Sequence, residues 1–282
     1  EKEGVRFFVN LTNDYEKKII PYKSQYSYIN YPIKDRHTPT DKKSFAQFII
    51  KIANIIDKLG KDELLYLHCK GGHGRSGVVV SILLCYIFKI KPQESLEYTT
   101  IYHNRRKIMR EKWRKIGSPQ TFEQKKFVHN FCKKITFYKA CRTGTTAGFS
   151  NFTTHPIIIK NLGIFPTSEA AFQAHKCLEN NEYVEKQKNS ISPIYSKKLG
   201  NKIKKQDNWY DIRLKIMYKI LKCKFDQYSE LKENLLNTGF CEIIYTNKND
   251  NFWGCGEDFI GENNLGKQLV KLREFYHKME LK

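Results

Sequence analysis

The sequence predicts two domains, an α/β domain with a central sheet flanked by helices and then a helix-rich α+β domain. Three observations predict this organisation. The length of 282 residues suits about two domains. Short apolar strands alternate with amphipathic helices in the first half, which is typical of an α/β fold. Helices dominate after Lys134, with few strands. We place the domains at residues 1–134 and 135–282, and because the chain begins at Glu1 and not at Met, we expect a truncated N-terminus.

The elements of the first half follow from the spacing of apolar residues. Extended apolar runs predict strands at 5–11, 27–33 and 64–67. Apolar residues at helical spacing predict helices at 44–59 and 76–88, a helix from about Pro92, and another that opens at Ser118-Pro119. Gly60 supplies a C-terminal stop for the first helix, and proline is favoured in a first helical turn.

In the second half the same spacing predicts mainly helices. We expect strands at 135–138 and 241–245, and helices at 167–180, 209–225, 231–236 and 264–278. Residues 151–166 have the composition of a loop. No Gly/Ser linker separates the halves, so the boundary rests on the change of pattern near Lys134.

The charge of the chain favours anionic partners. Lysine and arginine total 50 against 29 acidic residues, a net charge of +21. Such a balance suits nucleic acid, phosphorylated metabolites or acidic protein. Most of the lysines are scattered singly and in pairs, which is also what a solvated surface looks like. The sign of the charge nevertheless favours a phosphorylated substrate.

The eight cysteines form no CxxC pair and no zinc-site spacing, which indicates a reducing, intracellular compartment such as the cytoplasm or nucleus. No signal peptide is evident. No apolar stretch approaches the about 20 residues that a membrane span needs, so we expect no membrane association. The eight histidines show no ligand spacing, so we expect no metal and no cofactor.

The run from His68 to Gly77 has the features of a phosphate-binding loop. An apolar strand leads into Cys69, a turn with three glycines follows, and an apolar helix begins directly after it. A glycine-rich turn at a helix N-terminus binds anions, because unpaired N–H groups and the helix dipole both attract phosphate. The residues of this turn, which we expect to bind substrate, are Lys70, Gly71, Gly72, His73 and Gly74.

Cys69 and Arg75 supply the chemistry of this loop. The positive field of the turn lowers the pKa of a thiol, and the thiolate is the nucleophile. Arginine holds two phosphate oxygens in a bidentate fork and follows them into the transition state. Ser76 can donate a hydrogen bond to the sulfur when it leaves. The other interpretation of Cys69, a buried strand cysteine, does not account for the rest of the run. Lys70 and His73 are either exposed loop residues or tune the choice of substrate.

This run resembles the signature of the dual-specificity branch of the protein tyrosine phosphatases. The resemblance covers about residues 5–134 and includes the pattern Ser-Pro-x-Thr-x-x-Gln at 118–124. It implies a phosphocysteine intermediate that water hydrolyses without a metal. It also implies an aspartate general acid upstream of the cysteine strand, for which we expect Asp35; Asp41 is the reserve and suits a helix N-cap. The loop departs from the RNA triphosphatase branch, which usually carries Asn and Thr where this chain has Gly74 and Ser76.

An ordered series of short motifs in the second half resembles the NADAR (YbiA-like) domain. The resemblance covers about residues 137–277. The motifs lie at 148–152, 166–176, 192–200, 207–209, 224–225, 235–239, 249–254 and 264–266. No single motif is decisive, and the order of the series carries the resemblance. The departures are small: Ser196 and Asn201 stand where the family usually has Ala and Arg.

The NADAR resemblance implies hydrolysis of N-glycosidic bonds in ribose phosphates, including release of ADP-ribose from guanine bases. An oxocarbenium-like ribose needs carboxylates that stabilise its charge and direct water, and Glu169 and Asp250 match the family's acidic positions. Lys176 is implied either to bind phosphate or to attack an opened ribose as an amine. Without the resemblance, Glu169 reads as an acid at a helix N-terminus. Substrate binding is implied for Trp209, Trp253, Asn151 and Asn264.

We therefore expect a bifunctional hydrolase. It would be a dual-specificity phosphatase that also hydrolyses N-glycosidic bonds in ADP-ribosyl conjugates of the ADP-ribosyl-guanine type, or in related ribose phosphates. The expected partners are a phosphorylated protein or nucleotide, and ADP-ribosylated nucleic acid or an ADP-ribose derivative. One alternative is a protein phosphatase whose second domain binds ADP-ribose or NAD without catalysis. Another is a nucleic-acid end-processing enzyme, in which the positive charge holds the polyanion. The sequence does not predict the oligomeric state.

Overall fold

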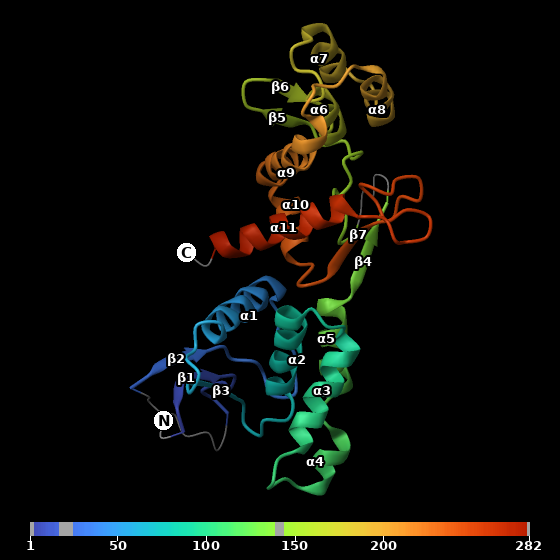
Figure 1. Cartoon of the computed structure of the whole chain (residues 1–282). Helices are drawn as coiled ribbons and strands as arrows, with labels where there is room; N and C mark the ends of the chain where they lie inside the picture. Colours follow the sequence, from blue (N-terminus) through green and yellow to red (C-terminus); the bar gives the residue numbers. More distant parts are fainter. Residues whose placement is uncertain (1–2, 17–24, 139–143, 281–282) are drawn as a thin grey trace. The chain divides into compact units, whose positions relative to one another are not determined.

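The computed structural model describes residues 3–16, 25–138 and 144–280, which divide into two compact units (Figure 1). The first unit runs to Lys133 and also includes Gly239–Cys241. The second comprises Lys134–Thr238 and Glu242–Glu280. The first is an α/β unit and the second a helix-rich α+β unit, as the sequence predicts. Each has its own apolar core.

The first unit is built on a parallel sheet of three strands in the order β2-β1-β3. The strands are β1 (Val5–Asn10), β2 (Ser27–Asn30) and β3 (Leu64–His68). All three lie where the sequence predicts strands. β2 ends earlier than expected because Pro32 follows closely and has no N–H to donate to a sheet.

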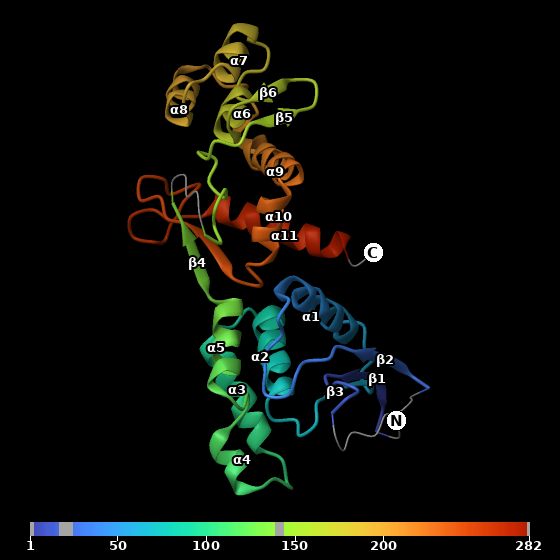
Figure 2. The ribbon, with the colours of Figure 1, turned by 180° about the vertical axis from the view of Figure 1, so that it is seen from behind.

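Five helices complete the first unit in the part of the chain that the structure describes. They are α1 (Lys42–Ile56), α2 (Arg75–Phe88), α3 (Pro92–Asn104), α4 (Glu111–Ile116) and α5 (Phe122–Cys132). Helix α2 packs against α1, α3 and α5, which explains why its sequence is apolar on most faces (Figures 1 and 2). Helix α5 begins at Phe122 and not at Ser118, because Thr121 and Gln124 form a capping box. The short, polar α4 was not predicted.

In its described residues, the second unit contains two separate pairs of strands and six helices. Strand β4 (Lys134–Phe137) pairs in parallel with β7 (Glu242–Tyr245), and β5 (Ile157–Ile159) pairs antiparallel with β6 (Gly163–Phe165). The helices are α6 (Ser168–Ala174), α7 (Asn181–Lys188), α8 (Pro193–Lys202), α9 (Trp209–Gln227), α10 (Ser229–Leu236) and α11 (Asn264–Met279). The long α9 packs against α6, α10 and α11.

Two expectations for the second unit were wrong. Residues 151–166 are not wholly loop, because they contain the hairpin of β5 and β6, whose strands are too short to show a period. The helix expected at 167–180 ends at Ala174. A second helix, α7, then begins after Asn180, whose side chain accepts a hydrogen bond from the backbone N–H of Tyr183 and caps it.

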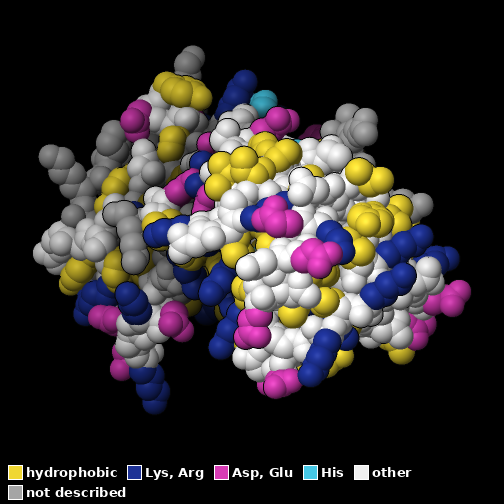
Figure 3. Space-filling view, turned by 90° about the horizontal axis from the view of Figure 1, so that it is seen from above, with side chains coloured by type: hydrophobic (Ala, Val, Ile, Leu, Met, Phe, Trp, Pro, Cys, Tyr) yellow, Lys and Arg dark blue, Asp and Glu magenta, His cyan; other side chains and the backbone are white. Residues whose placement is uncertain are grey.

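On the face of the molecule seen in Figure 3, the charged side chains are scattered, as the sequence predicts. On the face seen in Figure 3, Lys and Arg side chains lie among acidic, apolar and other polar groups and do not form one patch. Within the described residues, no helix combines the length and apolarity that crossing a bilayer requires.

Candidate active sites

The first candidate site lies where strand β3 ends and helix α2 begins. Gly74 is the N-cap residue of α2, and the backbone N–H groups of Gly72 and Ser76 donate to the Cys69 sulfur. Two glycines are required here. Gly72 has φ of +66°, and a side chain at Gly74 would lie 2.9 Å from the amide of the fully buried Gln124.

Cys69 is set for thiolate chemistry. Its side chain is buried, and the backbone N–H of Gly72 donates to Sγ at 3.2 Å. Burial raises the pKa of the thiol, but hydrogen bonds from the hydroxyl and N–H of Ser76, the charge of Arg75 and the Gly72 N–H outweigh it. The pKa of Cys69 therefore lies below its ordinary value.

Arg75 is almost fully buried and is held on one side of its guanidinium. Nη1 donates to the backbone oxygens of Leu11, at 3.3 Å, and Ile33, at 2.8 Å. Nη2 lies 3.0 Å from Oδ1 of Asp35. Nε is buried and has no hydrogen-bond partner in the described part of the chain. Nε is thus a donor whose hydrogen bond the described residues do not use.

Glu16 also holds Arg75, a contact that no motif or spacing in the sequence indicates. Its carboxylate pairs with both Nη atoms, with Oε2 at 2.9 Å from Nη2. The N–H of Asn13 donates to Oε1 at 3.0 Å. Burial raises the pKa of Glu16, but the hydrogen bond from Arg75 outweighs it together with Asn13, so the pKa is lowered. A charged carboxylate therefore sits beside the guanidinium of Arg75.

The structure separates the two candidate acids. Asp35 is exposed and ion-paired with Arg75, so it borders the loop. Asp41 instead accepts a hydrogen bond from the N–H of Ser44 at 3.0 Å and caps helix α1.

The side chain of His73 points to other residues than Cys69. Its Nδ1 lies 2.8 Å from Nε2 of His103, and its ring stacks on Trp113. Burial, then His103 and Arg106, lower the pKa of His73.

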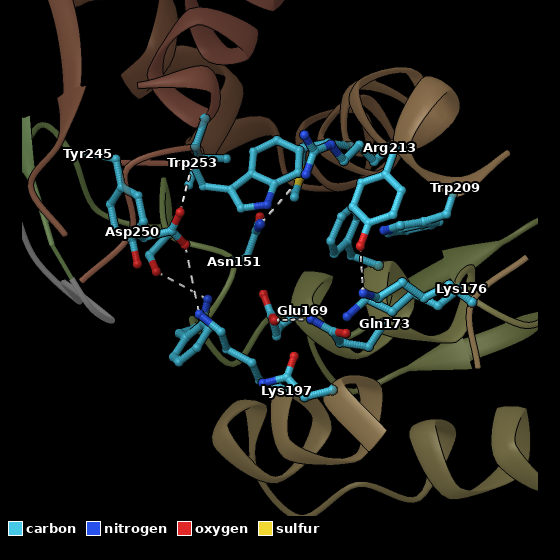
Figure 4. A pocket seen from close by; sticks show the side chains of 18 residues that line it. Asn151, Glu169, Gln173, Lys176, Lys197, Trp209, Arg213, Tyr245, Asp250 and Trp253 are labelled. Atoms are coloured by element: carbon cyan, nitrogen blue, oxygen red, sulfur yellow. Dashed lines mark hydrogen bonds and ion pairs between the residues drawn. The ribbon is translucent and has the colours of Figure 1, made fainter. Parts of the chain in front are cut away.

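The second candidate site is a pocket of about 220 Å³ within the second unit (Figure 4). It is lined by residues of α6, α8 and α9 and by the segment that follows β7. Six of the seven residues that the sequence assigns to this site line it: Asn151, Glu169, Lys176, Trp209, Asp250 and Trp253. The seventh, Asn264, is not among the lining residues; its side chain donates to Glu262 at 2.8 Å, and its neighbour Leu265 lines the pocket.

Glu169 is a buried carboxyl group in the first turn of α6. Oε1 accepts a hydrogen bond from Nε2 of Gln173, one turn later, at 2.7 Å. Burial raises the pKa of Glu169, and the hydrogen bond from Gln173 and the charges of Lys197 and Lys176 only partly offset it. Burial thus favours the protonated form of Glu169, which is the form that can donate a proton.

Lys176 is buried at the other end of α6. Its Nζ donates to the backbone oxygen of Gly200 at 2.8 Å. Burial lowers the pKa of Lys176 to about 8, with a further lowering by Lys205, while Glu169 acts in the opposite sense. Gly200 is needed for this contact, since a side chain there would collide with Gln173. Lys176 thus titrates close to neutral pH.

Asp250 and the aromatic residues close the pocket. Oδ1 of Asp250 accepts the N–H of Trp253 at 2.8 Å, and Oδ2 lies 3.9 Å from Nζ of Lys197. In Figure 4, Asp250 and Lys176 lie on opposite sides of Glu169. The rings of Trp209 and Trp253 both pack on Phe172, with centroids 5.1 and 5.3 Å away. The tryptophans therefore serve the core as well as the wall of the pocket.

Three cationic residues of the pocket were not assigned from the sequence. Lys197, Lys205 and Arg213 line it beside Lys176, against the two carboxyl groups of Glu169 and Asp250. Lys197 lies in one of the NADAR-like motifs, but nothing in the local sequence separates Lys205 from the other exposed lysines. The result is a pocket that attracts anions around a buried acid.

Neither site has a recognisable metal cluster. Among residues 3–16, 25–138 and 144–280, no group of three or more His, Cys, Asp or Glu side chains is placed to hold a metal ion. Seven of the cysteines are free thiols in the same ranges, and Cys141 lies outside the described residues.

Comparisons with known proteins match both halves of the chain. The NADAR domain family matches residues 136–276. The family described as Swiss Army Knife protein, DSP-PTPase phosphatase domain, matches residues 2–128. Protein 197R of Invertebrate iridescent virus 6, named as a tyrosine phosphatase, is 30% identical over 284 residues, which is 100% of this chain and 85% of the viral protein.

The second half is also similar to bacterial proteins. The N-glycosidase YbiA of Escherichia coli is 37% identical over 142 residues, which is 50% of this chain and 86% of YbiA. The NMR structure of E. coli YbiA is similar at 32% identity with a TM-score of 0.48, covering 53% of this chain and 89% of that structure.

Proposed function

The chain belongs to the NADAR family and joins a NADAR domain to a DSP-PTPase phosphatase domain, and we propose that it is a bifunctional hydrolase with one active site in each unit. The first site removes phosphate from a phosphomonoester. The second hydrolyses an N-glycosidic bond in an ADP-ribosyl conjugate or a related ribose phosphate. A reducing compartment suits the thiolate on which the first activity depends.

The phosphatase assignment is carried by the geometry around Cys69, where inward N–H groups and Arg75 surround a thiol with a lowered pKa. The thiolate attacks phosphorus, the bond to the leaving oxygen breaks, and Asp35 donates the proton that this oxygen needs. Water then attacks the phosphocysteine, Asp35 takes up its proton, and inorganic phosphate leaves. Arg75 and the loop N–H groups stabilise the charge on phosphate oxygens in both steps.

The glycosidase assignment is carried by the buried Glu169 in a cationic pocket. The cationic side chains would bind the phosphates of the substrate. Glu169, whose protonated form is favoured by burial, would donate a proton to the leaving base as the bond to ribose breaks. Asp250 would stabilise the positive charge on the ribose and direct water to it. Trp253 and Trp209 offer apolar walls for the base.

Lys176 has two roles consistent with this site. As an ammonium ion it would hold phosphate. As a free amine, which a pKa of about 8 makes accessible, it would attack C1 of an opened ribose while this carbon is still joined to the base as an iminium. The base then leaves as its amine, and water hydrolyses the lysine imine to free the ribose. Its position beside Glu169 suits either role, and the two differ in their pH dependence.

One experiment tests both activities on the full chain. The protein is incubated with an oligonucleotide that carries ADP-ribosylated guanine, and released ADP-ribose is measured by mass spectrometry; p-nitrophenyl phosphate hydrolysis is measured in parallel. Cys69→Ser is expected to lose only the phosphatase activity, and Glu169→Gln only the release of ADP-ribose. Each variant is therefore the control for the other.

The result also separates the alternatives. If the wild type binds ADP-ribose but releases none from any conjugate, the second unit is a binding module and the glycosidase proposal fails. If activity on long oligonucleotides falls steeply with salt while activity on small substrates does not, nucleic-acid end-processing is favoured.

A further inference from the structure

We propose that Arg106 is a positioning residue of the phosphatase site. Its guanidinium donates hydrogen bonds to two backbone carbonyl groups of the phosphate-binding loop, those of Gly71 and Gly72. These bonds hold the carbonyl groups outward, so that the N–H groups of the same peptides face the Cys69 sulfur and the substrate phosphate. This inference rests on the proposed role of Cys69 as the nucleophile. It adds a residue from the segment after α3, far from the loop in sequence, that neither the motif nor the comparisons point to.

Arg106 contacts the loop through two hydrogen bonds, one from each Nη atom of its guanidinium, and we call this pair of bonds the grip. Nη1 donates to the backbone oxygen of Gly71 at 3.3 Å, and Nη2 donates to that of Gly72 at 2.9 Å. In a trans peptide the C=O and N–H bonds point in opposite directions. The peptide whose oxygen Gly71 contributes has its N–H on Gly72, and this N–H donates to Sγ of Cys69 at 3.2 Å. Arg106 and Cys69 therefore bind the two ends of one peptide dipole.

The next peptide along the loop is held in the same way. Oγ of Ser118 donates to the backbone oxygen of His73 at 2.7 Å. Three consecutive outward carbonyls, those of residues 71–73, thus accept hydrogen bonds from side chains outside the loop. With the oxygens fixed outward, the N–H groups of Gly72, His73 and Gly74 are preset to face inward before a phosphate arrives.

Gly72 makes the approach of Arg106 feasible. A Cβ atom at this position would lie 2.8 Å from Nη2 of Arg106, and the φ of +66° is itself one that side chains rarely adopt. The glycine therefore serves two purposes, the turn and the close contact. A bulkier residue here would push the guanidinium off both carbonyls.

The side chain of Arg106 is exposed, but hydrogen bonds from Arg114 hold its backbone in place. The guanidinium of Arg114 donates to the backbone oxygen of Arg106 at 2.6 Å and to that of Asn104. The segment that carries Arg106 is thus tied down at two points. Only an arginine offers a planar fork that bridges two neighbouring oxygens, whereas lysine is a single point charge.

The grip has an electrostatic consequence for Cys69. A cation at the carbonyl oxygen polarises the peptide and strengthens the hydrogen bond that its N–H donates to sulfur. That N–H is one of the groups that favour the thiolate. Arg106 thereby acts on the sulfur through the peptide between them.

The test measures the thiol directly. Alkylation of Cys69 by iodoacetamide in the folded full chain is followed against pH by mass spectrometry of its peptide, with and without inorganic phosphate. Arg106→Met is expected to raise the apparent pKa of Cys69 by about one unit, the equivalent of one charged hydrogen bond, and to weaken protection by phosphate roughly tenfold. Arg105→Met is the matched control and should behave as wild type, since Arg105 stacks on Tyr102 and has no contact with the loop among the described interactions.

Arg106→Lys distinguishes the effect of the positive charge from that of the two-donor guanidinium geometry. It keeps the cation, so a change that resembles Arg106→Met supports the grip, and a wild-type profile overturns it. A wild-type thiol pKa and phosphate protection in Arg106→Met also overturn the proposal, whatever happens to its unfolding temperature. If Arg106→Met does not fold, Arg106→Lys decides alone. A wild-type protein whose Cys69 has an ordinary pKa and no phosphatase activity would instead refute the proposed nucleophile.

Discussion

The carboxylate of Glu16 and the guanidinium of Arg75 form a bidentate ion pair, with Oε2 at 2.9 Å from Nη2. The two residues are separated by 59 positions in the chain. The pair occupies both Nη atoms and leaves the buried Nε free. Glu16 therefore holds the guanidinium by its two Nη atoms, and this would orient Arg75 if it binds phosphate as proposed.

Glu16→Gln tests this role. The amide keeps the shape but loses the charge and one acceptor for Arg75. We expect kcat/KM for p-nitrophenyl phosphate to fall roughly 10- to 100-fold, the loss of one or two charge-assisted hydrogen bonds. Glu63→Gln is the control, because Glu63 is an exposed carboxylate that pairs with Arg6 in the same unit. Equal activity of the two variants would exclude an orienting role for Glu16.

The general acid is tested by changing the leaving group. Proton donation matters most when the leaving oxygen is basic. Asp35→Asn should therefore reduce hydrolysis of an alkyl phosphate roughly 100-fold or more, and hydrolysis of p-nitrophenyl phosphate much less. Asp41→Asn should leave both rates unchanged, because asparagine caps a helix as well as aspartate does. The reverse result would make Asp41 the acid.

Glu169→Gln should remove the glycosidase activity without unfolding the pocket. Glutamine keeps an oxygen that can accept from Gln173, but it has no proton to give. We expect kcat to fall roughly 10²- to 10⁴-fold, with little change in KM. Because burial raises the pKa of Glu169, loss of its proton opposes the gain of a free amine on Lys176, and the wild-type pH–rate profile should be bell-shaped. A variant that retains its rate would leave Asp250 as the essential acid.

The two roles of Lys176 predict opposite pH dependence. If the free amine reacts, the rate rises as pH rises through about 8, where half of Lys176 is deprotonated. If the ammonium binds phosphate, KM rises over the same range. We expect the first outcome, because a lysine with a lowered pKa is suited to attack a carbonyl. Borohydride should then trap a ribose adduct on Lys176, whereas Lys176→Arg should be inactive and untrapped. An active Lys176→Arg would favour the phosphate-binding role.

Local sequence predicted the parts of both sites that lie close together in the chain. The strand, the glycine turn and the apolar helix around Cys69 form one continuous stretch, so their pattern is visible without a structure. Glu16 and Arg106 reach the same loop from distant segments, and their own neighbourhoods contain no repeat or spacing that links them to it. The motif at 118–124 is intermediate, because its pattern is visible in the sequence but its contacts are not. The structure shows that Ser118 donates to the backbone oxygen of His73 and that Gln124 packs beside Gly74.

The fold was predicted best where elements are long. Helices α1, α2, α9 and α11 have enough turns for apolar spacing to be read, and their predicted bounds differ from the structure by a few residues. The three-residue strands β5 and β6 carry no measurable period, and the polar α7 depends on its Asn180 cap. Such short elements are fixed by tertiary contacts rather than by local preference.

Lys224 is a buried cation whose titration we expect to affect stability. It is fully buried on α9, and Nζ donates to the backbone oxygens of Gly148 and Ser150 and to Oγ1 of Thr153, the last at 2.7 Å. These acceptors belong to the loop that carries Asn151 into the pocket. Burial lowers the pKa of Lys224 to about 7.

The sign of the effect follows from proton binding. Between pH 7 and about 10.4, the unfolded chain keeps a proton on this lysine that the folded chain has lost. The free energy of unfolding of the second unit should therefore rise with pH over this window. Below pH 7 both states hold the proton, so Lys224 adds no pH dependence to stability there. Lys224→Met should remove this slope, and should also cost about 1–3 kcal/mol because the loop oxygens lose their donor.

The measurement is denaturant-induced unfolding of the full chain at several pH values, followed by hydrogen exchange of peptides from α9. Lys219→Met is the matched control, since Lys219 is an exposed lysine on the same helix. The control should keep the pH slope of the wild type. An unchanged slope in Lys224→Met would show that Lys224 keeps its proton in the folded state, held by its three acceptors, and would contradict the lowered pKa.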